Sequence, residues 1–137
     1  MTDYPLPACS LPHAYPFLML DRIVERSEGR SIVCLKNVSA NDFFVRGGPQ
    51  VEAVMPWTLL VEAMAQASGL IMQKEGRSSA FLSGLKGVRF LRAAVPGEAL
   101  IISASLAGEF PPLCLFEAAV HVMGELISEA EISLVFR

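Results

Sequence analysis

The feature that most constrains this chain is a long apolar segment that begins at Pro56 and ends at Gly76. Residues 57–75 between them are rich in leucine, alanine and methionine, which favour a helix. A proline at the start and a glycine just past the end are typical helix boundaries. Apolar side chains occur nearly all round the predicted helix, so we expect it to be buried. Glu62 and Gln66 are four residues apart and share one face, which places one polar spot on this helix.

Predicted strands surround the helix in the sequence. Before it, apolar runs at 17–24 and 31–38 flank a turn and predict a β-hairpin, and residues 41–50 predict a loop. After it come four further strands with short connections, at 80–91, 98–106, 113–122 and 126–136. That order predicts an antiparallel meander. Such a sheet can wrap one helix, so we expect an α+β fold with an antiparallel sheet around one long central helix.

The length of 137 residues predicts a single domain, residues 1–137. Its first 16 residues contain four prolines and predict an extended arm with room for one short turn. Residues 1–12 have no basic region followed by an apolar run, so we do not expect a secretory signal.

The composition is more apolar than is usual, with 53% hydrophobic and 18% charged residues. Either a membrane segment or an oligomer would explain it. Residues 51–72 are the longest nearly charge-free run in the first three-quarters of the chain, and Glu52 and Glu62 lie inside it, so we reject a membrane span and expect an oligomer.

Charge and cysteine content exclude other classes. A net charge of −3 argues against a nucleic-acid surface. Cys9, Cys34 and Cys114 are widely spaced and form neither a disulfide framework nor a zinc pattern. We expect reduced thiols in a cytoplasmic protein that has no metal and no cofactor.

Several short stretches, taken in order, resemble one family. They are Leu11-Pro-His-Ala-Tyr-Pro-Phe-Leu-Met-Leu-Asp-Arg22, Leu35-Lys-Asn-Val38, Phe43-Phe44, Val54-Met-Pro56, Leu60-Val-Glu-Ala-Met-Ala-Gln-Ala67, Gly84, Arg89-Phe90 with Arg92, and Val95-Pro-Gly97. Over about residues 11–137 the chain resembles the 3-hydroxyacyl-[acyl-carrier-protein] dehydratases of fatty-acid synthesis. The resemblance implies a hot-dog fold and acyl-carrier-protein thioesters as substrates. It also implies dimers or trimers of dimers, with active sites at the dimer interface.

The resemblance implies a dehydration mechanism, and this sequence lacks one of the residues that the mechanism uses in the family. In the family a histidine in a Gly-His-Phe-Pro-Gly motif removes the proton next to the thioester carbonyl, and a helix glutamate protonates the departing hydroxyl. Backbone N–H groups at the helix start polarise the thioester oxygen. The glutamate is present as Glu62, whereas Gly47 stands where the histidine is expected. Trp57 replaces the small residue that follows Pro56 in the family.

A divergent branch resembles the chain more closely. The dehydratase-like hot-dog proteins of aryl-polyene and related polyketide clusters keep a Leu-Pro-His start and a tryptophan near the helix start. They lack the Gly-His-Phe-Pro motif.

Each candidate residue has a plainer alternative. Glu62 is the expected acid, or else an idle buried carboxylate. His13 is the candidate base, or else an anchor for the arm, and His121 lies mid-strand, where half-exposure is expected. Gln66 either orients Glu62 or binds a loop. The remaining substrate-binding candidates are Trp57, Phe44, Gly47 and Gly48.

Basic residues offer a further alternative. Arg77, Lys86, Arg89 and Arg92 either receive an acidic carrier protein or are scattered surface charges. Arg46, in the altered loop, either pairs with Glu62 or faces solvent.

Three functions stay open. The first is a dehydratase or dehydratase-like enzyme that uses Glu62 and His13 on carrier-protein or coenzyme A thioesters. The second is an acyl thioesterase that uses Glu62 alone. The third is a non-catalytic subunit that joins a paralogous hot-dog protein in a hetero-oligomer.

Overall fold

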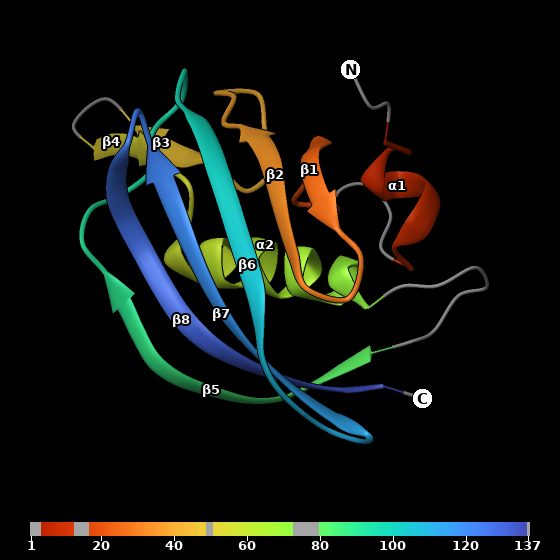
Figure 1. Cartoon of the computed structure of the whole chain (residues 1–137). Helices are drawn as coiled ribbons and strands as arrows, with labels where there is room; N and C mark the ends of the chain where they lie inside the picture. Colours follow the sequence, from red (N-terminus) through yellow and green to blue (C-terminus); the bar gives the residue numbers. More distant parts are fainter. Residues whose placement is uncertain (1–3, 13–16, 49–50, 73–79, 137) are drawn as a thin grey trace.

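A computed structural model describes residues 4–12, 17–48, 51–72 and 80–136. Its centre is helix α2 (Trp57–Ile71), around which a six-stranded sheet curves (Figure 1). The helix begins at the predicted residue and ends at Ile71, and Met72 follows outside it. The predicted helix through Glu75 is therefore wrong at Met72, and residues 73–75 lie outside the described part of the chain.

The sheet is antiparallel and mixes strands from both ends of the chain. Its order is β1-β2-β6-β7-β8-β5. The strands are β1 (Arg22–Ser27), β2 (Ser31–Asn37), β5 (Ala80–Phe90), β6 (Ala99–Phe110), β7 (Leu113–Val122) and β8 (Glu125–Phe136). The α+β class and the sheet around a central helix are confirmed, and this arrangement is the expected hot dog.

The predicted meander of four strands is wrong in one respect. Strands β6, β7 and β8 are neighbours in sequence order, but β5 pairs with β8, from Ala80 opposite Phe136 to Phe90 opposite Ser128. Residues 91–98 link β5 to β6, which lies between β2 and β7. A short connection such as residues 91–98 can cross the end of the sheet, so the two strands that it joins need not be neighbours.

The first strand starts later than the sequence predicts. Residues 17–20 belong to the predicted strand, yet β1 begins at Arg22. The cause is an interaction with the helix, since the Met19 N–H donates to Gln66 Oε1 and the Phe17 carbonyl accepts from Gln66 Nε2. A side chain of α2 thus satisfies backbone groups that a strand partner would otherwise bind.

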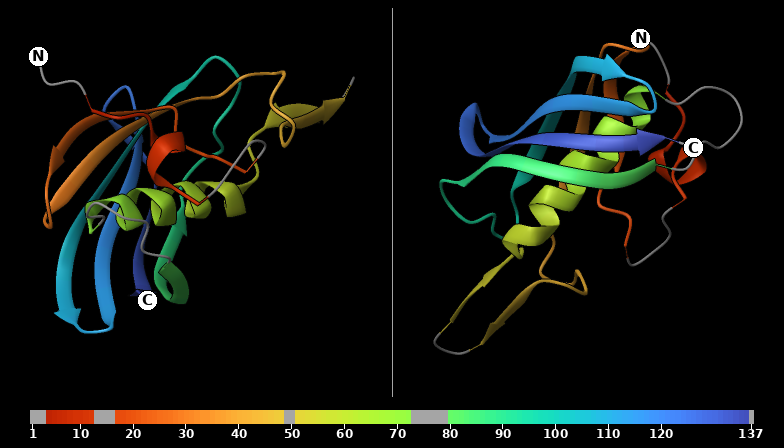
Figure 2. Two further views of the ribbon diagram at one scale, coloured as in Figure 1. Left: turned by 90° about the vertical axis from the view of Figure 1, so that its right-hand side faces the viewer. Right: turned by 90° about the horizontal axis from the view of Figure 1, so that it is seen from below.

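The predicted loop at 41–50 is also partly wrong. It contains β3 (Arg46–Gly48), which pairs with β4 (Val51–Val54) in a small separate sheet. This hairpin projects beyond the N-terminal end of α2 (Figure 2). Near the start of the chain, the expected short turn is the four-residue helix α1 (Pro7–Ser10).

Alternating strand residues face α2 and form the core. Large buried side chains from the helix and sheet include Leu60, Met64, Ile102, Phe116 and Ile132. Cys34 is fully buried in this core, and burial raises the pKa of its thiol to about 12, so the thiol stays protonated. None of the helices in the described part of the chain is long and apolar enough to span a membrane.

Candidate functional site

One side of α2 is not covered by the sheet. Leu59, Glu62, Ala65 and Gly69 follow helical spacing and are half-buried, while Trp57 at the helix start is 52% exposed. The expectation of burial on all sides is therefore wrong for the isolated chain, because the sheet curves round only part of the helix surface.

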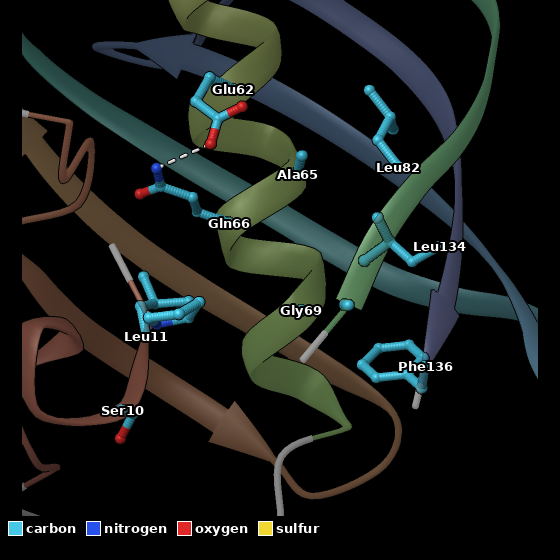
Figure 3. Close-up of a pocket in the computed structure, with 11 residues that line it drawn as sticks. Ser10, Leu11, Glu62, Ala65, Gln66, Gly69, Leu82, Leu134 and Phe136 are labelled. Carbon is cyan, nitrogen blue, oxygen red and sulfur yellow. Dashed lines mark hydrogen bonds between the residues drawn. The ribbon is translucent and has the colours of Figure 1, made fainter. Parts of the chain in front are cut away.

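A cavity of about 130 Å³ lies along this half-buried side. The helix, the N-terminal arm and the ends of β5 and β8 all contribute to its wall (Figure 3). Its lining residues are Ser10, Leu11, Pro12, Glu62, Ala65, Gln66, Gly69, Ala80, Leu82, Leu134 and Phe136. Among these described lining residues, Glu62 is the one acidic or basic side chain.

Glu62 and Gln66 meet in this wall as their spacing predicts. Nε2 of Gln66 donates a hydrogen bond to Oε1 of Glu62 at 2.9 Å (Figure 3). Gln66 is 2% exposed, and its amide also donates to the Phe17 carbonyl at 2.8 Å and accepts from the Met19 N–H at 2.9 Å.

The two alternatives for Gln66 are therefore not exclusive in the structure. Its amide group has two donors and one acceptor oxygen, and all of them are engaged within the protein. The same side chain holds the 17–19 segment against the helix and fixes one oxygen of Glu62. A carboxamide is neither an acid nor a base near neutral pH, so Glu62 is the member of the pair that could transfer a proton.

The candidate base and one basic residue fall outside the described residues. These are His13 and Arg77, and their predicted roles stay predictions. The described residues on either side of the 13–16 segment both reach the site: Pro12 lines the cavity, and the Phe17 carbonyl binds Gln66. His121 lies on β7 and is half-buried, as expected.

Trp57 lies at the helix N-terminus and outside the cavity lining. Its ring stacks on Phe90 of β5, with ring centroids 5.1 Å apart and planes at 19°. Offset aromatic stacking of this kind fixes the indole over the first turn of α2. The first backbone N–H groups of a helix lack intrahelical partners, so the indole lies beside the group of donors that could polarise a carbonyl.

The residues that stand in place of the family's Gly-His-Phe-Pro-Gly motif are not among the described residues that line the cavity. Gly47 and Gly48 belong to β3, on the hairpin that projects beyond α2 (Figure 2). Phe44, just before it, is half-buried, and its ring centroid lies 5.4 Å from the Lys36 Nζ. The side chain of Arg46, and with it the predicted choice between Glu62 and solvent, lies outside the described part of the structure.

Two of the basic residues, Arg89 and Arg92, form ion pairs on the sheet and are not isolated surface charges. Arg89 pairs with Glu129 at 2.9 Å, and Arg92 pairs with both Glu98 and Glu125. The hydrogen bond from Arg92 lowers the pKa of the Glu98 carboxyl, against a smaller opposing effect of burial. Arg89 and Arg92 therefore stabilise the sheet and its adjoining turn through these ion pairs. Lys86 lies exposed on β5. The described residues contain no group of three or more His, Cys, Asp or Glu that could hold a metal.

Several pocket residues escape prediction from the sequence. Leu82 and Leu134 are directly paired across β5 and β8, and they form an apolar wall together with Phe136 (Figure 3). Their strand pattern gives only a local alternation. Which end of which strand faces Glu62 depends on the pairing of β5 with β8, which no local pattern encodes.

Comparisons with known proteins agree with this geometry. The protein-family model of the FabA-like domain matches residues 11–131 of this chain. A 3-hydroxyacyl-[acyl-carrier-protein] dehydratase FabZ of Listeria monocytogenes serotype 4b is 39% identical over 125 residues, which cover 89% of this chain and 87% of that protein.

Two further matches differ in length and identity. The bifunctional enzyme LpxC/FabZ of Chlorobaculum tepidum is 40% identical over 126 residues, and the match covers 89% of this chain but only 27% of that enzyme. The solved dehydratase heterocomplex ApeI:P of Xenorhabdus doucetiae contains a chain with the same fold. That match has a TM-score of 0.86 and 23% identity, and it covers 98% of this chain and 92% of the other.

Proposed function

The chain belongs to the FabA-like family of 3-hydroxyacyl-[acyl-carrier-protein] dehydratases, and from this we propose that it eliminates water from 3-hydroxyacyl thioesters of an acyl carrier protein. The observation that carries the proposal is the Glu62–Gln66 pair in the wall of a largely apolar cavity. An acyl chain needs such an apolar wall, and elimination of water needs a proton donor beside it.

The proposed reaction has two proton transfers. A base takes a proton from the carbon next to the thioester carbonyl, and the electron pair forms the new double bond as the C–O bond at the next carbon breaks. The Glu62 carboxyl gives its proton to the departing hydroxyl, which leaves as water. Gln66 binds Oε1 of Glu62 and so fixes the carboxyl group in the cavity wall.

We propose His13 as the base. Its neighbour Pro12 lines the same cavity as Glu62, and covalent geometry keeps adjacent Cα atoms about 3.8 Å apart. Phe17, on the far side of the 13–16 segment, is bound to Gln66. The described residues on both sides of residues 13–16 therefore lie at the site, which supports His13 as the base.

The remaining candidates surround the thioester. The N-terminus of α2 offers backbone donors for the carbonyl oxygen, and the exposed Trp57 ring forms one side of that entrance. Phe44, Gly47 and Gly48 lie on or next to the projecting hairpin, in the place where the family carries its catalytic motif. In this role they shape the entrance and do not react.

We propose that two copies complete the site. Strand β5 is an open edge of the sheet, and three of its apolar side chains, Phe81, Leu82 and Leu85, are 44–51% exposed. Leu82 also lines the cavity, so a second copy paired at this edge would close over it. Long apolar edge strands are normally paired or covered. A homodimer, or a trimer of dimers, would satisfy this edge.

The experiment that tests this function is a direct assay for the enoyl product. The purified chain is given a 3-hydroxyacyl carrier-protein thioester, and enoyl absorbance is followed. Glu62→Gln should lower turnover on the order of 100-fold or more while the fold is retained, and the exposed Glu52→Gln is the control. His13→Ala should also lower turnover; normal turnover in that variant would refute the assignment of the base. No product at high enzyme concentration would refute dehydration.

A thioesterase is the second candidate, since Glu62 is the one titratable side chain among the described lining residues. A carboxylate that attacks the thioester or activates water needs no histidine. Release of free thiol from acyl-coenzyme A, detected with a thiol reagent, would favour this reaction over dehydration.

The third candidate is a non-catalytic subunit, and Gly47 in place of the family histidine is the observation that favours it. Co-purification with a paralogous hot-dog protein that keeps the histidine would support that role. High activity of the pure homo-oligomer would exclude it.

A further inference from the structure

One buried charge in the molecule takes no part in the proposed reaction. Lys36 is near the end of β2 and faces the same side as Ile32 and Cys34, which belong to the core. It is only 5% exposed. A buried ammonium group is costly unless it is paired, so its partners indicate the role of the charge.

Two carboxylates and one aromatic ring surround the ammonium group. The Lys36 Nζ lies 3.8 Å from Oδ1 of Asp21 and 3.6 Å from Oδ2 of Asp42. The centroid of the Phe44 ring is 5.4 Å away, within cation–π range. These three residues come from two separate segments, one before β1 and one after β2.

Each carboxylate also accepts a hydrogen bond from a nearby backbone N–H. Asp21 Oδ2 accepts from the Asn37 N–H at 2.7 Å, and Asp42 Oδ2 accepts from the Ser39 N–H at 2.8 Å. The Asp42 carbonyl in turn accepts from the Val45 N–H at 3.1 Å. The loop of residues 39–45 is thus folded around Asp42, and the Lys36 charge lies beside it.

The two segments lead to the two parts of the proposed site. Asp21 is two residues after Met19, whose N–H is held by the Gln66 amide that also binds Glu62. Asp42 is two residues before Phe44, and β3 with Gly47 and Gly48 follows directly. Lys36 is therefore the link between the Glu62 side of the site and the hairpin side.

We propose that Lys36 is a positioning residue whose ammonium group fixes the 39–45 loop, and with it Phe44 and the start of β3, relative to residues 17–21, which the Gln66 amide binds to α2. Its catalytic consequence rests on the proposed function. Its structural consequence does not, because the position of the loop can be measured without substrate.

The test is hydrogen–deuterium exchange, followed peptide by peptide in the intact protein without substrate. Lys36→Met keeps the aliphatic stem and removes the charge. We expect exchange in residues 39–45 to accelerate on the order of tenfold, because the loop loses its ion pair with a buried charge, with exchange in α2 and β7 unchanged. Lys36→Arg should restore most of the protection. The exposed Lys86→Met is the matched control and should change nothing in this loop.

A second variant protects the test against misfolding. Asp42→Asn keeps an oxygen for the Ser39 N–H and removes the charge that faces Lys36. It should accelerate exchange in the same loop, and the Lys36→Met/Asp42→Asn double variant should add little, because both changes break one interaction. Unchanged loop exchange in both single variants, or equal acceleration throughout the sheet, would overturn the proposal.

Turnover supplies the second readout. If the chain is a dehydratase, Lys36→Met should lower kcat more than it raises KM, and Lys36→Arg should recover most of the loss. If the wild-type chain forms no enoyl product, the proposed function fails while the exchange result still decides the role of Lys36. Accelerated loop exchange with wild-type kcat would show that the loop position does not matter for catalysis and would refute the catalytic part of the proposal.

Discussion

Gln66 donates a 2.9 Å hydrogen bond from Nε2 to Oε1 of Glu62, and the same buried amide binds the backbone of Phe17 and Met19. One side chain therefore joins the 17–19 segment, which follows the N-terminal arm, to the candidate acid. The 17–19 segment and the acid should respond together when Gln66 is substituted.

Gln66→Met should weaken both stability and turnover. Methionine fills a similar volume but leaves the Met19 N–H and the Phe17 carbonyl without their partner, which costs about 2–3 kcal/mol in a buried setting. Chemical denaturation measures the loss in the free energy of unfolding, and the enoyl assay measures turnover. Ser68→Ala is the control, because the Ser68 hydroxyl is also buried but donates to the Met64 carbonyl of its own helix. Full stability of Gln66→Met would contradict the role of Gln66 in holding residues 17–19.

Trp57 should report on ligands at the start of α2. It is the single tryptophan of the chain, it is half-exposed, and it stacks on Phe90. A carrier-protein thioester bound at that entrance should change its fluorescence, and Trp57→Ala should raise KM. A double-mutant cycle of Trp57→Ala with Phe90→Ala should give a coupling of about 0.5–1.5 kcal/mol in stability. Saturating substrate that leaves the fluorescence unchanged would remove Trp57 from the substrate-binding residues.

Leu85→Lys should disrupt the assembly and leave the fold intact. Leu85 is 44% exposed on β5, an edge of the sheet, and a lysine on an edge strand disfavours pairing with another chain. Sedimentation velocity should show a smaller species, with an unchanged circular dichroism spectrum. Val24→Lys is the matched control, since Val24 is 54% exposed on β1 at the opposite edge. Loss of assembly in the Val24 variant alone would move the interface to the β1 edge and contradict the prediction.

Glu98→Gln should lower stability at neutral pH but not in acid. The Arg92 guanidinium holds the pKa of the folded Glu98 carboxyl below its ordinary value of 4.5. The stabilisation is therefore complete above pH 4.5 and is lost as the pH falls through the lowered folded value. We expect a difference of about 1 kcal/mol or less at pH 7, because the pair is partly exposed. Thermal unfolding between pH 3 and pH 7 measures it, with the exposed Glu28→Gln as the control. A difference that grows toward low pH would reverse the assigned sign.

The sequence by itself determined the features that depend on neighbouring residues. Pro56 and the apolar residues after it are sufficient to predict the start of α2 and the burial of most of its surface, because helix boundaries and helix faces are local properties. The i, i+4 spacing of Glu62 and Gln66 is likewise sufficient to place both side chains on one face. Most strand boundaries follow from alternation for the same reason.

Tertiary structure alone decided how these elements meet. The pairing of β5 with β8 brings Leu82 and Leu134 into the cavity wall with Glu62, and strand pairing depends on long-range contacts that no local pattern contains. The start of β1 lies at Arg22, not at the predicted Phe17, because the Gln66 amide, 49 residues away from Phe17, binds the backbone there. The role of Lys36 arises in the same way, since only the folded chain brings Asp21 and Asp42 to one buried charge.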